Sequence, residues 1–231
     1  YADLPQVALQ PNDEYRSTVL KDLLKETYII DILERNRVKN SAELEELLAM
    51  LASGIGGLTN PQKLSNTFKT AKNVSIGAPT LKSYIDYFCD AFLVEQVNRY
   101  DVKGKRYIGT PLKYYFSDLG LRNALLNFRQ VEKTHLMENL IYNELRGRGY
   151  NVDVGVVPYN GKNAQGVSFR KQLEVDFVCN KGSQRLYVQS ALALPTQEKI
   201  DQETKSLRRI DDGFQKMVVV GDHTIGSHDE S

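Results

Sequence analysis

Histidine and cysteine are scarce in this chain, with three histidines and two cysteines among 231 residues. No Cys-x-x-Cys spacing occurs, so a structural zinc site is not expected. Cys89 and Cys179 lie far apart in the sequence, each beside aromatic and apolar neighbours. That setting is typical of buried free thiols in a reducing cytoplasm.

Long apolar runs and strong net charge are also lacking. No run approaches the ~20 residues of a membrane span, and no signal peptide is visible. We therefore predict a cytoplasmic location and no membrane partner. The 30 basic and 29 acidic residues leave a net charge of +1, so any surface for nucleic acid must be local.

A nucleotide-binding P-loop is missing as well. The glycine-rich segment 54–57 has neither the lysine nor the preceding strand that Gly-x-x-x-x-Gly-Lys-Ser/Thr requires. The chain begins at Tyr1 without an initiator methionine, which indicates a fragment of a longer protein. Its length predicts one or two domains at roughly 150 residues each.

The N-terminal half has the pattern of helices followed by a hairpin. We predict helices over residues 15–36 and 41–52, a third over 61–72 and a fourth that begins at residue 78. Leu44, Leu47, Leu48 and Leu51 share one face of the second helix. Extended segments follow at 92–97 and 113–116, joined by a cation-rich connection over 101–106. This order is typical of a winged helix, which we assign to a domain of residues 1–128.

A winged helix offers a specific interpretation of four cations. Lys82 would lie on the recognition helix, and the wing would carry Lys103, Lys105 and Arg106 against DNA phosphates. The alternative is a packing or protein-contact module. The exposed side of the recognition helix favours that alternative, because it offers no arginine or asparagine to read bases.

The second half, residues 129–231, predicts an α/β domain. A helix over 132–148 precedes strands at 151–157, 168–179 and 185–191, then a helix over 196–210 and a strand at 216–220. The expected fold class is α+β, in which the helical winged-helix domain is followed by this α/β domain of packed helices and strands.

Three segments of this second domain have the pattern of a metal-dependent nuclease site. Glu138 lies on or beside the apolar face of its helix, and alternation places Glu174 and Asp176 on one face of their strand. A helix packed on that sheet would bring Glu138 to Asp176 and to Gln189 of the next strand. Two or three oxygen ligands suit Mg²⁺, which would polarise a phosphate and activate a water.

The nuclease pattern is incomplete at its third and fourth positions. Gln189 replaces a carboxylate, and Ala191 stands where a lysine is expected. Loss of such a donor costs on the order of 10²–10³ in rate. We predict two acids that face each other across a small polar pocket with no cation opposite, although Lys171 or Lys181 could supply the charge from elsewhere. The alternative is a buried hydrogen-bond cluster that holds helix to sheet, with His135 beside it.

The order of several motifs resembles the region after the ATPase module in a prokaryotic group of AAA-type ATPases. The motifs are the segments 48–53, 81–88, 115–122, 138–145, 174–178 and 187–189, read as LAMLAS, LKSYIDYF, YFSDLGLR, ENLIYNEL, EVDFV and YVQ. The resemblance implies a winged helix followed by a domain similar to PD-(D/E)xK nucleases. It implies core acids at Glu138 and Asp176, with Glu174 beside them and Gln189 at the third position. ATP would bind in a module outside this chain.

These observations lead to three functional hypotheses. The first is a region of an AAA-type ATPase that recognises DNA or another partner through a nuclease-like domain without activity. The second is a Mg²⁺-dependent DNA nuclease that uses Glu138, Asp176 and Gln189. The third is a module for protein interaction or self-association.

Overall fold

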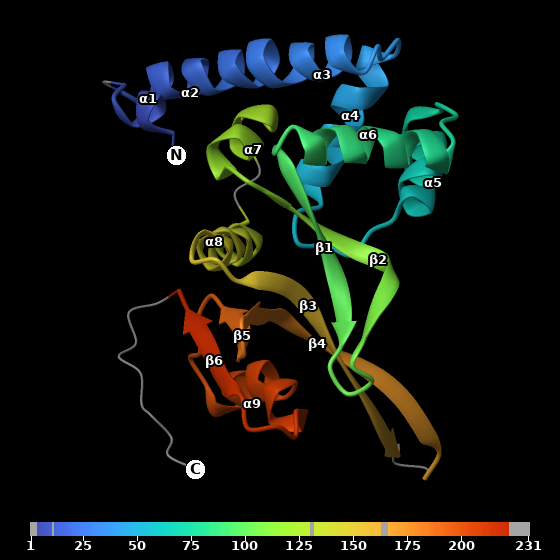
Figure 1. The fold of residues 1–231 in the computed structure, drawn as a ribbon, viewed down its shortest axis with the longest axis vertical. Coiled ribbons are helices and arrows are strands. Elements are labelled where there is room, and N and C mark those ends of the chain that lie inside the picture. The colour runs from blue at the N-terminus through green and yellow to red at the C-terminus, as the bar shows by residue number, and fades with distance from the viewer. Residues whose placement is uncertain (1–3, 11, 130–131, 163–165, 222–231) are drawn as a thin grey trace. The chain divides into compact units, whose positions relative to one another are not determined.

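The computed structural model describes residues 4–10, 12–129, 132–162 and 166–221 (Figure 1). Contacts divide the chain into two compact units. The first contains residues 1–97 and 109–139, and the second contains residues 98–108 and 140–231. The expected division into domains of residues 1–128 and 129–231 stays a prediction.

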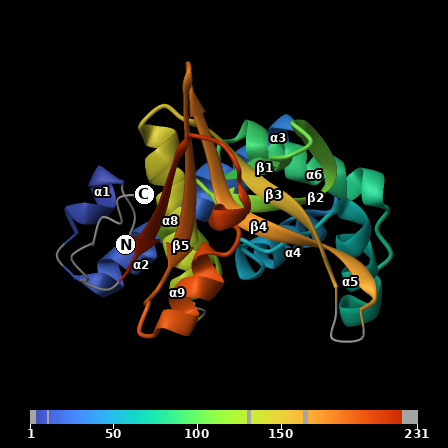
Figure 2. The same cartoon turned by 90° about the horizontal axis from the view of Figure 1, so that it is seen from below.

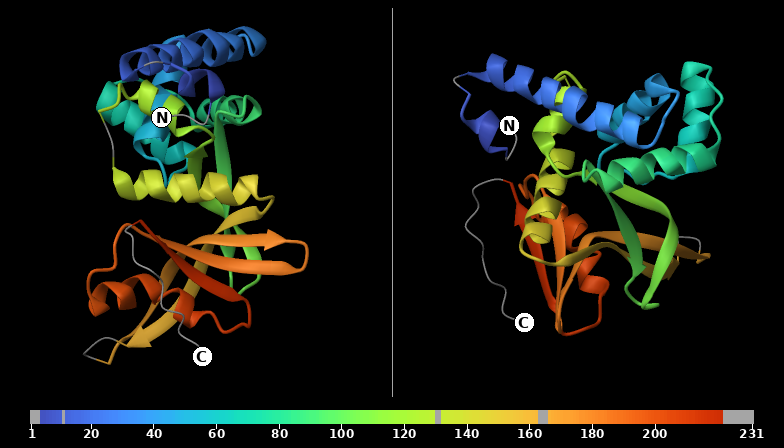
Figure 3. Two further views of the ribbon diagram at one scale, coloured as in Figure 1. Left: turned by 90° about the vertical axis from the view of Figure 1, so that its left-hand side faces the viewer. Right: turned by 45° about the horizontal axis from the view of Figure 1, so that its top comes forward.

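A long helical rod opens the first unit after the short helix α1 (Pro5–Ala8). It consists of α2 (Asp13–Asp22), the π-helical segment η1 (Leu23–Ile29) and α3 (Ile30–Arg35), which run on without a break (Figure 3). The side chain of Asn12 accepts from the Tyr15 amide and so caps the rod. The helix predicted over 15–36 is confirmed, whereas its π-helical middle has no counterpart in the apolar spacing.

Three further helices form the core of the first unit: α4 (Ser41–Ser53), α5 (Pro61–Lys72) and α6 (Ala78–Asp90). All three were predicted, and the leucine face of α4 is buried. α6 packs on both α4 and α5, and α7 (Leu119–Leu125) packs on α4 and α2. Arg122 of α7 is almost fully buried and donates from Nε to the Ala52 carbonyl at 2.9 Å, which fixes the end of α4.

Six strands form one mixed open sheet in the order β2-β1-β3-β4-β5-β6. They are β1 (Val94–Asp101), β2 (Arg106–Phe116), β3 (Asn151–Lys162), β4 (Ser168–Lys181), β5 (Gln184–Ala191) and β6 (Gln215–Val220). The β1–β3 and β5–β6 pairs are parallel, and the pairs between them are antiparallel (Figure 2). The expected α+β class is thus confirmed.

The hairpin expected over residues 92–116 is present, but its first strand belongs to the larger sheet. Tyr100 pairs with Gly155 of β3, and the Val102 amide donates to the Val156 carbonyl at 3.0 Å. Val102 is buried in the core of the second unit, to which this turn belongs. The hairpin is therefore no isolated two-stranded wing, and its role as a wing stays a prediction.

The second unit buries its core on one face of the sheet. Leu207 and Ile210 pack there on valines of β3 and β4, on Tyr187 and on Val102. Leu207 begins the 3-10 turn η2 (Leu207–Arg209) and Ile210 follows it; the turn comes after α9 (Gln197–Thr204). The other face of β5 and β6 meets the C-terminal half of α8 (Lys133–Gly147). Among the described residues, no helix is both long and apolar enough to cross a bilayer.

Candidate functional site

Glu138, the helix acid of the predicted nuclease site, is paired with two side chains of β2. Lys113 Nζ lies 2.8 Å from its Oε1, and the Tyr115 hydroxyl donates to the same oxygen. Lys113 and Tyr115 are two positions apart on the strand, so both point to Glu138. The Lys113 and Glu138 side chains are only 4% and 9% exposed. The prediction that no cation faces the acids is therefore wrong for Glu138.

The next residue of α8 strengthens the same attachment. Asn139 accepts from the Phe116 amide through Oδ1 and donates from Nδ2 to the Phe116 carbonyl, both at 2.8 Å. β2 is an edge strand, and its backbone would otherwise lack partners there. The first half of α8 is thus fixed to β2 by an ion pair and by a side-chain amide that replaces a neighbouring strand.

The Glu138 carboxylate also lies against the backbone of Gly56. A Cβ at Gly56 would lie 3.3 Å from Glu138 Oε2 and 3.4 Å from His135 Nδ1. Gly56 has φ +71, a conformation that favours glycine. His135 Nδ1 is buried and has no hydrogen-bond partner among the residues that the structure describes, while Nε2 is 3.5 Å from Glu132. His135 thus lies near the acid, as expected of a neighbouring polar residue.

Asp176, the strand acid, occupies a β-bulge of β4. Gly155 pairs with Val175 and Asp153 with Val178, so one residue of β3 lies opposite Asp176 and Phe177. The β4–β5 ladder ends beside this bulge at the Phe177–Val188 pair. Beyond that pair, the amide and the hydroxyl of Ser190 both donate to Asp176 Oδ2 at 2.7 Å. The carboxylate therefore continues the link between β4 and β5 where backbone pairing stops.

Gln189 and Ala191, both on β5, have partners on the two neighbouring strands. Gln189 Oε1 accepts from the Asp176 amide at 3.4 Å, so the predicted neighbours Asp176 and Gln189 are indeed together. Ala191 is buried and pairs with Val220 of β6. Glu174 is half-buried two residues before Asp176. Glu138 belongs to the first unit and Asp176 to the second, so their juxtaposition stays a prediction.

The two lysines that could have replaced the missing cation have other contacts. Lys181 Nζ donates to the Arg148 carbonyl at 2.8 Å and lies over the Tyr150 ring. Lys171 lies over the ring of Phe169. The described residues include no group of three or more His, Cys, Asp or Glu placed to hold a metal ion. The donors named above reach one oxygen of each acid, Oε1 of Glu138 and Oδ2 of Asp176.

The four cations assigned to DNA differ in their surroundings. Lys82 is paired with Asp86 on the same face of α6. Arg106 is 73% exposed and lies 3.8 Å from Asp101, whose Oδ1 also accepts from the Gly104 amide. Lys103 and Lys105 are exposed in the turn between β1 and β2. The turn therefore offers more available positive charge than α6.

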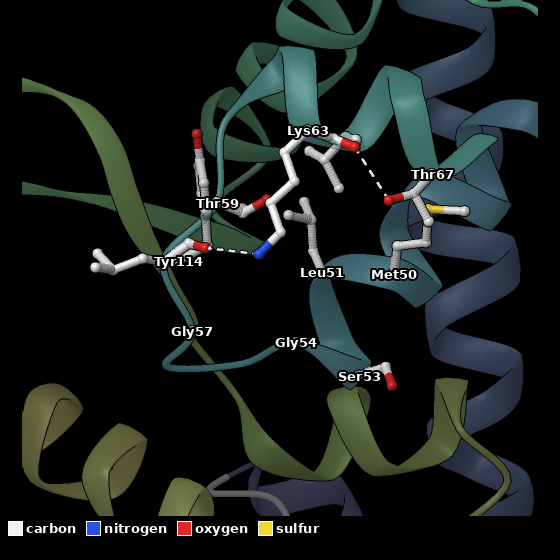
Figure 4. A pocket seen from close by; sticks show the side chains of 11 residues that line it. Met50, Leu51, Ser53, Gly54, Gly57, Thr59, Lys63, Thr67 and Tyr114 are labelled. Atoms are coloured by element: carbon white, nitrogen blue, oxygen red, sulfur yellow. Dashed lines mark hydrogen bonds between the residues drawn. The ribbon is translucent and has the colours of Figure 1, made fainter. Parts of the chain in front are cut away.

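A pocket of ≈ 330 Å³ lies in the first unit between α4, α5 and the loop 54–59 (Figure 4). Lys63 extends into it and donates from Nζ to the Leu58 carbonyl at 3.2 Å, while Thr67 donates to the Lys63 carbonyl. Tyr114 closes one side, and burial raises its pKa to about 12. The lining contains no carboxylate or histidine that could act with Lys63 in acid–base chemistry.

A basic and aromatic surface on the second unit was not predicted. Arg209 Cζ lies 4.4 Å and Lys205 Nζ 6.0 Å from the ring centre of Tyr159. That ring meets Phe169 edge-on at 5.9 Å, and Lys171 Nζ lies 5.1 Å over the Phe169 ring. We call these five residues the basic–aromatic stripe. The sequence offered one signal, the paired arginines at 208–209, but not their contact with β3.

A second aromatic cluster in the same unit differs in charge. Arg185 lies between the rings of Tyr100 and Phe214 and donates to Asn180 at 2.8 Å. Asp153 is nearby; burial raises its pKa, although Arg185 and a hydrogen bond from Tyr107 act in the opposite direction. The cation of this cluster is thus already satisfied within the fold.

Comparison with known proteins identifies the family. A family model described as a domain of unknown function, DUF8612, matches residues 3–132. The chain belongs to the DUF8612 family. The matched residues include Lys113, Tyr115 and the β1–β2 turn, whereas Glu138 and Asp176 lie beyond them.

Two curated relatives align with nearly the whole chain. An uncharacterized protein of Haemophilus influenzae is 31% identical over 221 residues, which cover 96% of this chain and 51% of the relative. An uncharacterized protein of Methanocaldococcus jannaschii is 25% identical over 226 residues, covering 95% and 50%. The chain therefore spans about half the length of these relatives. No solved structure matches it.

Proposed function

We propose that this DUF8612 chain is a recognition region of a longer protein, and that it binds nucleic acid without cutting it. The observation that carries the proposal is that both acids of the nuclease-like pattern already accept hydrogen bonds from side chains or backbone of this chain. Glu138 is neutralised by Lys113, and Asp176 accepts twice from Ser190. A Mg²⁺ ion that displaced Lys113 from Glu138 would leave the Lys113 ammonium buried without its partner, which is costly.

The longer protein in this proposal is an AAA-type ATPase. The support is the order of the six motifs named above, together with relatives about twice as long as the chain. ATP would then bind in the part that this chain lacks, and the helices α4–α6 with the hairpin would correspond to the winged helix. The test is a nucleotide-binding assay on a full-length relative, in which the absence of ATP binding contradicts the proposal.

The nucleic-acid surface in this proposal is the turn between β1 and β2. Lys103 and Lys105 are exposed, and Arg106 beside them is 73% exposed and lies 3.8 Å from Asp101. Each phosphate contact contributes a slope of about −0.9 to the dependence of log K on log salt for duplex DNA. Removing three such contacts would therefore reduce the magnitude of this slope by about 2.7.

A salt series of binding assays with duplex DNA tests this surface. The variant carries Glu at positions 103, 105 and 106. The matched control carries Glu at the exposed positions 21 and 25 of the helical rod and at the exposed position 39 after it. Both variants change the net charge equally. We expect only the first to lose affinity and salt dependence. Equal losses in both variants would reduce the effect to overall charge.

Cleavage is tested separately with supercoiled plasmid and Mg²⁺ or Mn²⁺. The wild-type chain and an Asp176→Ala variant are expected to leave the plasmid intact. Nicking by the wild type that disappears in Asp176→Ala would instead support the nuclease hypothesis. Nicking that persists in the variant would come from a contaminant.

Self-association is the second candidate function, and an apolar groove favours it. The groove of ≈ 580 Å³ is lined by α8, β5 and β6, including Leu145, Val188 and Met217. Leu140 at its rim is 54% exposed, and β6 is an edge strand of half-buried valines. Such an edge can pair with a second copy. A monomer mass by light scattering across a hundredfold concentration range would exclude this candidate.

A further inference from the structure

We infer that the basic–aromatic stripe of the second unit binds single-stranded nucleic acid. The stripe consists of Tyr159 on β3, Phe169 and Lys171 on β4, and Lys205 and Arg209 around η2. The inference deepens the proposed function by naming a ligand class. It assigns that ligand to residues other than the turn that we assign to duplex DNA.

The register of β3 and β4 brings the strand cation Lys171 and the two rings together. Tyr159 pairs with Lys171, and Gly161 pairs with Phe169, so their side chains point to the same face of the sheet. A Cβ at Gly161 would lie 2.5 Å from Cζ of Phe169. The glycine therefore leaves the space in which the Phe169 ring lies across β3.

The chain after α9 supplies the remaining cations to this face. Leu207 and Ile210 are buried in the core on the same side of the sheet, and Arg209 lies between them in sequence. With these neighbours anchored, the exposed Arg209 guanidinium lies over the Tyr159 ring. A guanidinium held on an aromatic ring loses less freedom when it binds a ligand than a free arginine does.

The three cations of the stripe have no acidic partner among the described residues. The structure gives Lys171, Lys205 and Arg209 contacts with aromatic rings, and none with a carboxylate within 4.0 Å. The neighbouring Arg208, by contrast, is paired with Asp201 at 3.0 Å. The stripe thus combines uncompensated positive charge with two partly exposed rings.

Single-stranded nucleic acid matches this combination. Its phosphates are attracted to the cations, and its unstacked bases can stack on aromatic rings or on arginine planes. Bases in a duplex are already stacked, so the rings would add little to its binding. An acidic peptide would use the cations without needing the aromatic rings. The rings therefore favour a single strand over both alternatives.

The experiment uses the whole 231-residue chain and a fluorescein-labelled oligothymidylate in anisotropy titrations at several salt concentrations. Tyr159→Ala should weaken binding ~10-fold, because base stacking on one ring is lost. Tyr159→Phe should retain wild-type affinity. Arg208→Ala is the matched control and should stay within twofold of the wild type.

A second variant tests the charges without touching a half-buried ring. Changing Lys171, Lys205 and Arg209 together to Ala should lower the salt slope by about 2, since each contact to a single strand contributes about 0.7. These three residues are exposed, so the variant keeps the core intact. Its result decides the inference even where Tyr159→Ala fails to fold.

Three outcomes overturn the inference: no binding of the oligonucleotide, equal loss in the Arg208→Ala control, or full displacement by polyglutamate with no effect of the ring substitution. The last outcome would identify an acidic peptide as the ligand. Failure here leaves the proposed function intact if duplex binding still depends on the β1–β2 turn. If only the stripe variants lose binding to duplex DNA, the β1–β2 turn is excluded as the duplex-binding surface.

Discussion

Replacing Lys113 by methionine should strongly destabilise the first unit. Lys113 and Glu138 are 2.8 Å apart and almost completely buried. Removing one partner of such a pair leaves an uncompensated buried charge, which costs about 3–5 kcal/mol. Tyr115→Phe should cost less, about 1.5–3 kcal/mol, because it removes one hydrogen bond to a charged acceptor.

The double variant Lys113→Met with Glu138→Leu separates the charge effect from packing. Since both charges are then absent, we expect most of the lost stability to return. Arg148→Met is the matched control. Arg148 lies just after the end of α8 and pairs with Glu144 of that helix at 2.7 Å, but both side chains are well exposed. Its cost should be at most about 1 kcal/mol.

Urea denaturation followed by circular dichroism measures these four variants and the single Glu138→Leu variant, with stability taken from the midpoint and slope. The reasoning is refuted if Lys113→Met costs no more than Arg148→Met. It is also refuted if the stability cost of the double variant equals the sum of the costs of Lys113→Met and Glu138→Leu. In either case Glu138 would not be held as a structural ion-pair partner, and its assignment to a catalytic role would regain support.

The remaining predictions concern groups in both units. Burial raises the pKa of Cys89 to about 11 and of Cys179 to about 12, so both thiols should react with Ellman's reagent only after denaturation. Because folding raises both pKa values, the stability linked to the protonated thiols should be complete below the unfolded pKa of ~8.5 and be lost as pH rises toward 11–12. Rapid labelling of the native chain at pH 8 would contradict the prediction that both thiols are unreactive in the folded state. Asp153→Asn should leave stability equal or slightly higher at pH 7, because the folded state raises the pKa of this acid, and the gain should vanish below about pH 4; a loss above about 1 kcal/mol at pH 7 would disprove it. Ser190→Ala should cost about 1.5–3 kcal/mol in urea denaturation by removing one donor to Asp176, whereas the exposed Ser168→Ala serves as the control and should have no effect.

Local order was readable from the sequence where neighbouring residues decide it. The helix at α4 follows from four leucines on one face and glycines after its end, and the predicted helices at α5 and α6 were confirmed in the same way. Alternation likewise predicted β4 and β5, whereas the shared face of Glu174 and Asp176 stays a prediction. These patterns depend on contacts within one element.

The partners of the candidate residues depended on the tertiary structure. Lys113 and Glu138 are 25 positions apart, Asp176 and Ser190 are 14 apart, and Tyr159 meets Arg209 from a different element. No local pattern encodes a β-bulge that ends a ladder or the register that brings Tyr159 beside Lys171. The sequence by itself determined which segments are helix or strand and which acids could matter. The tertiary structure decided that those acids are neutralised or anchored, because burial makes an unpaired charge too costly to leave without a partner.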